Sequence, residues 1–322
     1  MSGSTSSACP DPSEPMATEL LLRRSILFLP ADRPERFAKA LASGADAVCV
    51  DLEDAVRPEA KDSAREVALG VTLKQPRRGV EVILRINDLS GDIGGRDLEA
   101  VCTADLAPDA VMLPKVVSVE EVRRAASLLE RWHPDLKLIP LVETASGLAA
   151  IEALAAASTR VSAIMFGGMD LSVELKCEPE WDPLLYARSR VVHAAALAGI
   201  GTIDVPFMDV SDPEGLAREA GAVRRLGFTG KAAIHPSQVP VIQQAFSPSE
   251  ADLERARKVM EASERSGGAA VLSDGKLIDR PVVEAARRTL ALAQAIRARS
   301  ASSAAGQSDA AGGGGGGGHR DS

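Results

Sequence analysis

Short apolar segments recur along the chain at intervals that suit strands separated by helices. They begin at residues 24, 47, 81, 110, 137, 162, 201 and 230, so successive starts lie 23 to 39 residues apart. Within each segment the apolar residues run almost without interruption, which is typical of strands covered on both faces of a parallel sheet. The eight segments are 24–30, 47–54, 81–87, 110–115, 137–143, 162–167, 201–206 and 230–236.

Most of the stretches between these segments carry a helical pattern. Alanine, leucine, glutamate and arginine recur at helical spacing in 34–43, 119–131 and 212–226. A strand followed by a helix, repeated around the chain, predicts a (β/α)8 TIM barrel of the α/β class over residues 20–247. A doubly wound open sheet is the alternative, but it requires a glycine-rich phosphate turn after the first strand. The sequence Leu29-Pro-Ala-Asp-Arg33 has no glycine there.

Residues 248–299 exceed what a barrel needs, and they predict a C-terminal helical arm. Helices are expected near 249–265 and 282–298, separated by a loop through Ser266-Gly-Gly268 and the short segment 277–281. This arm is expected either to cap one end of the barrel or to pack on another subunit.

Both ends of the chain are expected to be disordered tails. Residues 1–19 are rich in serine, proline and alanine, and residues 300–322 are rich in glycine, alanine and serine. Neither stretch can bury enough apolar surface to offset the entropy lost on ordering.

Composition and charge narrow the possible function classes. Of the 322 residues, 45% are hydrophobic and 25% are charged, which excludes disorder throughout the chain. Length alone suggests roughly two domains at about 150 residues each, and one large barrel with appendages fits equally well. The formal net charge of -8 has the wrong sign for neutralising nucleic-acid phosphates. We therefore expect no nucleic-acid partner.

Cysteine spacing and the length of the apolar segments indicate the compartment. Cys9, Cys49, Cys102 and Cys177 are too widely spaced for a metal or redox pair, and Cys49 lies in an apolar run where a buried thiol is usual. No stretch approaches the roughly 18 apolar residues of a membrane span, and the N-terminus lacks an apolar signal core. A cytoplasmic protein without a membrane partner is expected.

Polar side chains follow seven of the eight apolar segments. Because the carboxyl ends of the strands form the reaction face of a parallel barrel, we expect many of these side chains to converge. Several carboxylates with two basic groups and one imidazole favour a hard cation, Mg²⁺ or Mn²⁺, over zinc. The residues are Asp51, Glu53, Asp54, Arg85, Asn87, Lys115, Glu143, Asp170, Asp204 and His235.

Glu143 and Asp170 are the expected metal ligands. Glu143 ends a mostly apolar segment, and Asp170 follows Phe166-Gly-Gly-Met169, whose glycines allow the backbone to approach a ligand closely. Taken singly, however, an acid at a strand end is also compatible with a helix cap or a surface turn.

Three basic residues at the strand ends have alternative interpretations. Arg85 suits either substrate binding or an ion pair with Glu53 or Asp54. His235 suits either a ligand contact or a hydrogen-bonded structural role, and Lys115 also suits a Schiff-base nucleophile.

Seven motifs together resemble the citrate lyase β-subunit-like family of CoA-ester lyases, within the HpcH/HpaI aldolase superfamily. The resemblance covers roughly residues 23 to 298, with the motifs in order. The motifs are Arg24-Ser-x-Leu-Phe-x-Pro30, Asp51-Leu-Glu-Asp-Ala-Val56, Leu84-Arg-Ile-Asn87, Leu113-Pro-Lys115, Glu143-Thr-Ala-x-Gly147, Gly230-Lys-x-x-Ile-His-Pro236 and Leu277-Ile-Asp279.

This resemblance implies a barrel of the phosphoenolpyruvate/pyruvate type that forms a homo-oligomer, a trimer or hexamer. It implies a lyase that uses magnesium to make or cleave a carbon–carbon bond in a 3-hydroxyacyl-CoA thioester such as malyl-CoA or citramalyl-CoA. The products of cleavage would be an acyl-CoA and a small 2-oxo acid.

The resemblance also implies roles for individual residues. Glu143 and Asp170 would bind the metal, and Arg85 and Glu143 would contact the substrate. Glu53 and Asp54 would orient metal-bound waters and Arg85 without binding the ion. Asp279, supplied by a neighbouring protomer, would be the acid–base residue and, with Arg85, would act in catalysis. The CoA-binding residues would be Arg24, Arg36, Lys39 and His235.

Two departures from the family pattern leave the acyl group open. Ala31 follows Pro30 where the family often has glycine, and Val117 occupies a position where glutamate is frequent. Three other functions remain as alternatives: an aldolase for free hydroxy-oxo acids, a citrate lyase β subunit acting on an acyl-carrier-protein thioester, and a thioesterase.

Overall fold

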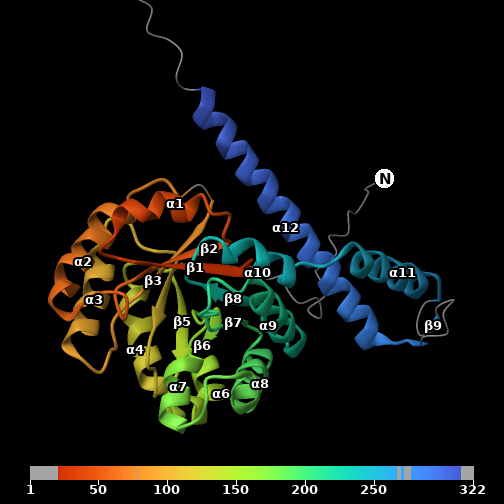
Figure 1. The fold of residues 1–322 in the computed structure, drawn as a ribbon, viewed down its shortest axis with the longest axis horizontal. Coiled ribbons are helices and arrows are strands. Elements are labelled where there is room, and N and C mark those ends of the chain that lie inside the picture. The colour runs from red at the N-terminus through yellow and green to blue at the C-terminus, as the bar shows by residue number, and fades with distance from the viewer. Residues whose placement is uncertain (1–20, 78, 267–269, 272–276, 313–322) are drawn as a thin grey trace, which may run out of the picture. The chain divides into compact units, whose positions relative to one another are not determined.

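The computed structural model describes residues 21–77, 79–266, 270–271 and 277–312, and it contains a closed barrel of eight parallel strands. Each predicted apolar segment contains one strand, so the TIM barrel is confirmed and the open sheet is excluded. The strands are β1 (Ser25–Pro30), β2 (Ala47–Asp51), β3 (Glu81–Arg85), β4 (Ala110–Leu113), β5 (Lys137–Val142), β6 (Ala163–Phe166), β7 (Gly201–Asp204) and β8 (Gly230–Ala233). They pair in chain order, and β1 also pairs with β8 (Figure 1).

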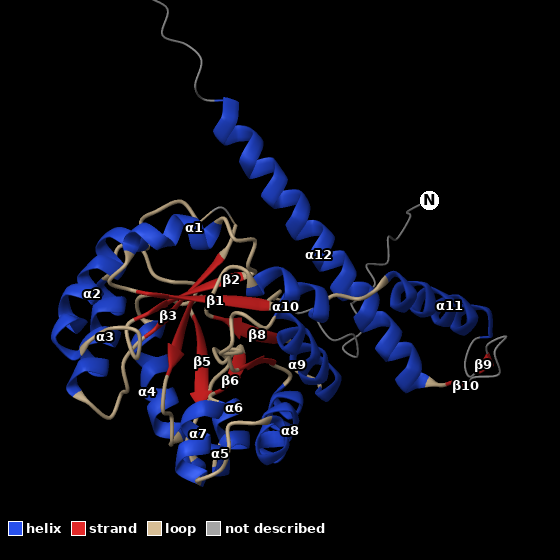
Figure 2. Cartoon of the chain, viewed as in Figure 1, coloured by secondary structure: helices blue, strands red, loops and turns tan. Residues whose placement is uncertain are grey.

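Helices follow the strands and surround the barrel (Figure 2). The α4 helix illustrates how the sequence sets a boundary, because Ser118 and Glu121 form a capping box at its start. The helices of the barrel are η1 (Pro34–Arg36), α1 (Phe37–Leu41), η2 (Pro58–Ala60), α2 (Lys61–Val67), η3 (Ala68–Thr72), α3 (Asp92–Thr103), α4 (Val119–Glu130), α5 (Ala145–Ala149), α6 (Ile151–Ala155), α7 (Gly168–Leu175), α8 (Trp181–Ala198), α9 (Pro213–Leu226) and α10 (Gln238–Phe246).

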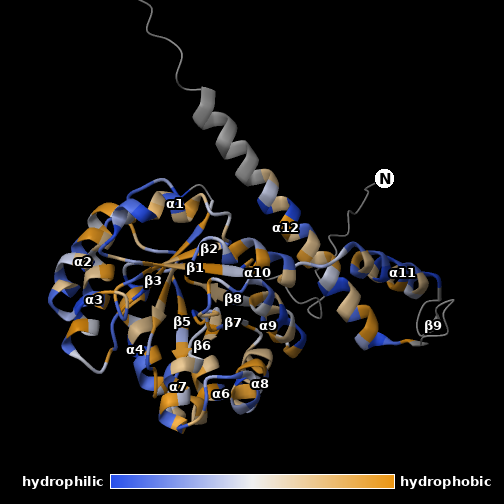
Figure 3. Ribbon diagram, viewed as in Figure 1, coloured by the Kyte–Doolittle hydropathy of each residue, from blue (hydrophilic) through white to orange (hydrophobic). Residues whose placement is uncertain are grey.

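Alternate residues of each strand pack on opposite sides of the barrel wall. The interior is filled by one cluster of buried side chains that includes Ile26, Cys49, Ile83 and Met165. A larger cluster fills the layer between strands and helices. Because both faces are covered, the strands are almost continuously hydrophobic, whereas the helices mix both kinds of residue (Figure 3). The same burial raises the pKa of the Cys49 thiol, as expected for a buried structural cysteine.

Residues Pro248–Ala301 belong to a compact unit distinct from the barrel unit Arg23–Ser247. The unit contains α11 (Glu250–Ser266), the short antiparallel pair β9 (Ala270–Val271) and β10 (Leu277–Ile278), and most of α12 (Arg280–Gly312). Buried residues of α11, β10 and α12 form its core, namely Ala256, Val259, Ile278, Val283 and Ala286.

The α12 helix ends at Gly312, whereas the sequence predicted a boundary near 298. Residues 300–311 include several alanines, which have the highest intrinsic helix propensity, and no proline interrupts them. The remaining parts of the predicted tails, residues 1–19 and 313–322, lie outside the described residues. Within the described part of the chain, no helix is both long and apolar enough to cross a bilayer.

Candidate active site

The alternation along β2 and β3 brings an acid and an arginine together at the carboxyl ends of these strands. Cys49 and Ile83 face the barrel interior, so residues two positions further on face the same way. These residues are Asp51 and Arg85, and they are also register partners across the strand pair.

Three carboxylates hold the Arg85 guanidinium. Its Nε donates to Asp51 Oδ1 at 2.7 Å and its Nη2 donates to Asp51 Oδ2 at 2.6 Å, a two-bonded fork that lysine cannot reproduce. Its Nη1 lies 2.9 Å from Glu53 Oε2 and 3.4 Å from Asp54 Oδ2. The Phe28 ring lies 5.4 Å from the guanidinium carbon. The predicted pairing of Arg85 with Glu53 and Asp54 is therefore present, and Asp51 is a partner to which sequence reasoning gave no role.

Glu53 lies between two cations. Its Oε1 accepts a hydrogen bond from Lys115 Nζ at 2.8 Å, and its Oε2 faces Arg85. Burial raises the pKa of the Glu53 carboxyl despite these two cations. The hydrogen bond to Glu53 raises the pKa of the Lys115 ammonium, whereas a Schiff-base nucleophile requires a lowered pKa. The geometry therefore disfavours the Schiff-base interpretation of Lys115.

Glu143 is a buried acid beside the connection that carries Asp170. Its Oε1 accepts the backbone N–H of Lys115 at 2.9 Å, and Glu143 is only 4% exposed. Burial, with the negative charges of Glu53 and Asp170, raises the pKa of the Glu143 carboxyl to about 8. Asp170 is exposed in the first turn of α7.

These donors fit a magnesium ion. Among the residues that the structure describes, no group of three or more His, Cys, Asp or Glu side chains is placed to hold a metal ion. Magnesium is usually bound by one or two carboxylates and keeps waters and substrate oxygens in its other positions. Glu143 and Asp170 would supply such a pair, and a dication would favour the ionised form of the buried Glu143 carboxyl.

Gly167 makes room for Glu143, and Gly167→Ala is expected to disturb the candidate metal site. A Cβ on Gly167 would lie 2.4 Å from Glu143 Cβ and 2.8 Å from Glu143 Oε2, so the acid must move. We expect a stability loss of about 1–3 kcal/mol, as for other overpacked interiors, together with weaker Mg²⁺ binding. Thermal unfolding and Mg²⁺ calorimetry measure the two effects. Gly95→Ala is the control, because nothing lies within 4 Å of its new Cβ. Normal Mg²⁺ affinity in Gly167→Ala would contradict this placement.

The side chains of Asn87 and Asp204 bond to residues in the layer between strands and helices, and not to the residues of the candidate site. Asn87 donates to the Asp97 carboxylate at 2.7 Å and to the Leu52 carbonyl at 3.1 Å. Asp204 is fully buried and binds Lys231 at 2.7 Å and Arg188 at 2.9 Å. Strand-end position alone therefore did not separate these residues from the site.

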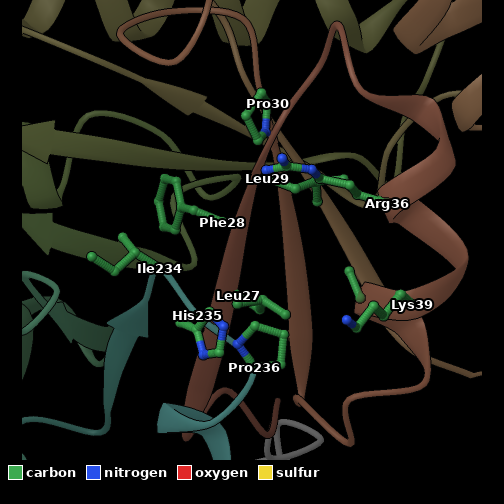
Figure 4. A pocket seen from close by; sticks show the side chains of 10 residues that line it. Leu27, Phe28, Leu29, Pro30, Arg36, Lys39, Ile234, His235 and Pro236 are labelled. Carbon is green, nitrogen blue, oxygen red and sulfur yellow. The ribbon is translucent and has the colours of Figure 1, made fainter. Parts of the chain in front are cut away.

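A pocket beside β1 gathers three of the four residues expected to contact CoA. Its lining includes Arg36 from η1, Lys39 from α1, and His235 after β8 (Figure 4). Arg36 and Lys39 are exposed, and the ring Nδ1 of His235 accepts the Ser237 backbone N–H at 3.2 Å. His235 thus both makes a local hydrogen bond and lines the pocket.

Arg24 lies at the other end of β1. It precedes the strand, and its Nε donates to Asp46 Oδ2 at 2.8 Å while its Nη1 donates to Ser247 Oγ at 2.7 Å. Arg24 is therefore not among the residues that line the pocket with the other three, and its contact with CoA stays a prediction. These two bonds connect the residue before β1 with the residue before β2 and with the residue after α10.

Asp279 caps the start of α12 within the arm unit. Its Oδ1 accepts the backbone N–H of Val282 at 3.3 Å, and the side chain is exposed. This is the local role that a single acid before a helix ordinarily has. Its acid–base role stays a prediction.

A closed parallel barrel with acids, an arginine and a lysine at the carboxyl ends of its strands defines an enzyme site of the (β/α)8 class. The model of the HpcH/HpaI aldolase/citrate lyase family matches residues 24–236. The chain belongs to this family of enzymes.

Named relatives extend over most of the chain. Citrate lyase subunit beta of Haemophilus influenzae is 33% identical, covering 84% of this chain and 96% of its own length. The mitochondrial citramalyl-CoA lyase of Homo sapiens is 32% identical, covering 85% and 86%. The (3S)-malyl-CoA thioesterase of Cereibacter sphaeroides is 35% identical, covering 87% and 97%. The structure of CitE from Mycobacterium tuberculosis with magnesium, acetoacetate and coenzyme A is 35% identical, with a TM-score of 0.72, and covers 84% of this chain and 97% of that one.

Proposed function

We propose that the protein is a magnesium-dependent CoA-ester lyase, which cleaves or forms a 3-hydroxyacyl-CoA thioester such as malyl-CoA or citramalyl-CoA. The observation that carries the proposal is the grouping of the forked Arg85 with buried Glu143 and nearby Asp170 at one end of the barrel. The family membership and the magnesium and coenzyme A in the CitE structure support it.

The chemistry requires a site that tolerates negative charge on oxygen. In cleavage a base accepts the hydroxyl proton, the electron pair of the bond between the α and β carbons moves to the thioester fragment as an enolate, and the β carbon becomes the carbonyl carbon of a 2-oxo acid. A proton must then reach the enolate carbon. Arg85, held rigidly by Asp51, would orient the substrate carboxylate and stabilise the developing oxyanion.

Glu143 and Asp170 would hold Mg²⁺, with Mn²⁺ a substitute for the same oxygen donors. When bound, the ion would supply a Lewis acid that polarises the oxygens of the departing fragment. Glu53 and Asp54 would steady Arg85 through their contacts with its Nη1.

CoA would occupy the pocket beside β1. Arg36 and Lys39 are exposed cations at its edge, and they suit the phosphates of CoA, while the apolar lining from Leu27 to Leu29 suits its pantetheine arm. In a homo-oligomer, Asp279 of a neighbouring protomer would complete the site as the acid–base residue.

A panel of CoA thioesters tests the proposal directly. The purified protein with Mg²⁺ should release an acyl-CoA and a 2-oxo acid from at least one 3-hydroxyacyl-CoA, and mass spectrometry should score acyl-CoA separately from free CoA. Release of free CoA alone would favour the second candidate, a thioesterase, which the similarity to the (3S)-malyl-CoA thioesterase supports. Turnover only of an acyl-carrier-protein thioester would favour a citrate lyase subunit.

Mg²⁺ binding should depend on pH through Glu143. Because the metal-free protein holds a proton on this carboxyl below a pKa of about 8, Mg²⁺ must displace that proton at lower pH. The dissociation constant should therefore fall about tenfold for each pH unit between 6 and 7, and level off above pH 8. Calorimetry in two buffers of different ionisation enthalpy should show release of about one proton at pH 7.

Replacing the proposed metal ligand Glu143 tests the same assignment by mutation. Glu143→Gln should weaken Mg²⁺ binding by at least the roughly 10–100-fold that losing an outer partner of a metal site costs, and it should abolish the pH dependence. Glu121→Gln, in the capping box of α4, is the control and should bind Mg²⁺ normally. Equal affinity in the wild type and Glu143→Gln would remove Glu143 from the metal site.

A further inference from the structure

Lys115 has a backbone conformation that its residue type disfavours. Its φ is 52°, and the only other residue besides glycine with positive φ in the described part of the chain is Lys176, with φ 56°. Lys176 ends α7 as a left-handed cap, which is a common place for such a conformation. Lys115 instead follows Pro114 in the turn after β4, where a positive φ ordinarily takes glycine or asparagine.

The backbone amide and the side-chain ammonium of Lys115 each donate a hydrogen bond to an acid of the candidate site. Its backbone N–H donates to Glu143 Oε1 at 2.9 Å, and its Nζ donates to Glu53 Oε1 at 2.8 Å. A strained backbone conformation persists only where the surrounding structure requires it. Here the two hydrogen bonds to Glu143 and Glu53 explain why Lys115 keeps its positive φ. Glycine would satisfy the turn but could not supply the ammonium.

We propose that Lys115 is a positioning residue that fixes two acids of the site at once. Its amide occupies Glu143 Oε1 and leaves Oε2, which lies beside Gly167, directed toward the segment that carries Asp170. Its ammonium holds Glu53 so that the other carboxylate oxygen faces Arg85 at 2.9 Å. The proposal rests on the proposed magnesium site and extends it to a residue that acts through Glu143 and Glu53.

A series of variants separates the amide from the ammonium. Lys115→Gly, Lys115→Ala and Lys115→Val all lack the ammonium, but they differ in how readily they adopt a positive φ, glycine most and valine least. Mg²⁺ affinity measured by calorimetry should therefore be close to the wild type in Lys115→Gly, and about 10–100-fold weaker in Lys115→Val. Equal affinities in Lys115→Gly and Lys115→Val would overturn the role of the amide.

The turnover number, kcat, tests the role of the Lys115 ammonium. Lys115→Gly should lower kcat by about 10–100-fold, and Lys115→Arg should restore part of that loss because arginine can again donate to Glu53. In the Glu53→Gln background the Lys115→Gly change should have a much smaller effect, since its partner is already neutral. Wild-type kcat in Lys115→Gly would overturn the role of the ammonium.

Lys176→Gly and Lys176→Val are matched controls, because they probe the other left-handed lysine. They should shift the unfolding temperature but leave Mg²⁺ affinity and kcat unchanged, and a similar loss of Mg²⁺ in Lys176→Val would show that the effect is not specific to Lys115. The calorimetry needs no thioester substrate, so a wild type that binds no Mg²⁺ contradicts the proposed metal site, whereas a wild type that binds Mg²⁺ no differently from Lys115→Val contradicts only the present inference.

Discussion

Arg85→Lys should lower kcat by about a hundredfold, the scale on which removal of one oxyanion donor slows an enzyme. Lysine keeps the charge but cannot make the two parallel bonds that Arg85 makes to Asp51 at 2.7 and 2.6 Å. The interaction between Arg85 and the substrate also strengthens as negative charge develops on the substrate oxygen. Weakening this interaction should therefore lower kcat. Steady-state kinetics with the active thioester measures this effect.

The separate changes in kcat and KM decide between two roles for Arg85. If Arg85 only binds substrate, the lysine variant should raise KM and leave kcat unchanged. Arg190→Lys is the control, because Arg190 pairs with Glu152 on the helical layer at 2.8 Å and should tolerate the change. Unfolding must be measured alongside, since Arg85→Lys leaves the buried Asp51 and Glu53 less completely paired.

The barrel was predictable because the strands are mostly apolar on both faces and most of the stretches between them carry a helical pattern. The period of two that buries Cys49 and Ile83 also directs Asp51 and Arg85 into the interior, so their contact could have been inferred from spacing once the register was known. Register depends on long-range strand pairing, which no local pattern states.

Other features of the site had no local signal. The positive φ of Lys115 follows from the position of Glu143, 28 residues further along the chain. The need for glycine at 167 likewise depends on Glu143, which directly follows the neighbouring strand β5. The ion pair of Arg24 with Asp46 was also not predicted, because a motif match carries residue identity but does not say which end of a strand the side chain occupies.

Asp279→Asn should separate the capping role of this residue from acid–base catalysis. Asparagine caps a helix about as well as aspartate, so stability should change little, whereas loss of a general acid–base group should cut kcat by about 10²–10⁴. Asp252→Asn is a matched control, because Asp252 accepts hydrogen bonds from Ser249 at the start of the other arm helix. Full activity in Asp279→Asn would leave Asp279 as a cap alone.

Mixed oligomers test whether Asp279 acts across a subunit boundary. Asp279→Asn protomers and Arg85→Ala protomers should each be inactive alone, because every site lacks one of its two functional halves. When the two are unfolded, mixed and refolded, some sites will combine an intact Arg85 from one protomer with an intact Asp279 from its neighbour, and activity should return. Size-exclusion chromatography with light scattering gives the oligomeric state, and differently tagged protomers allow the mixed species to be isolated. If purified mixed oligomers stay inactive, Asp279 does not serve a neighbouring site. A monomer with wild-type activity would likewise exclude a site shared between subunits.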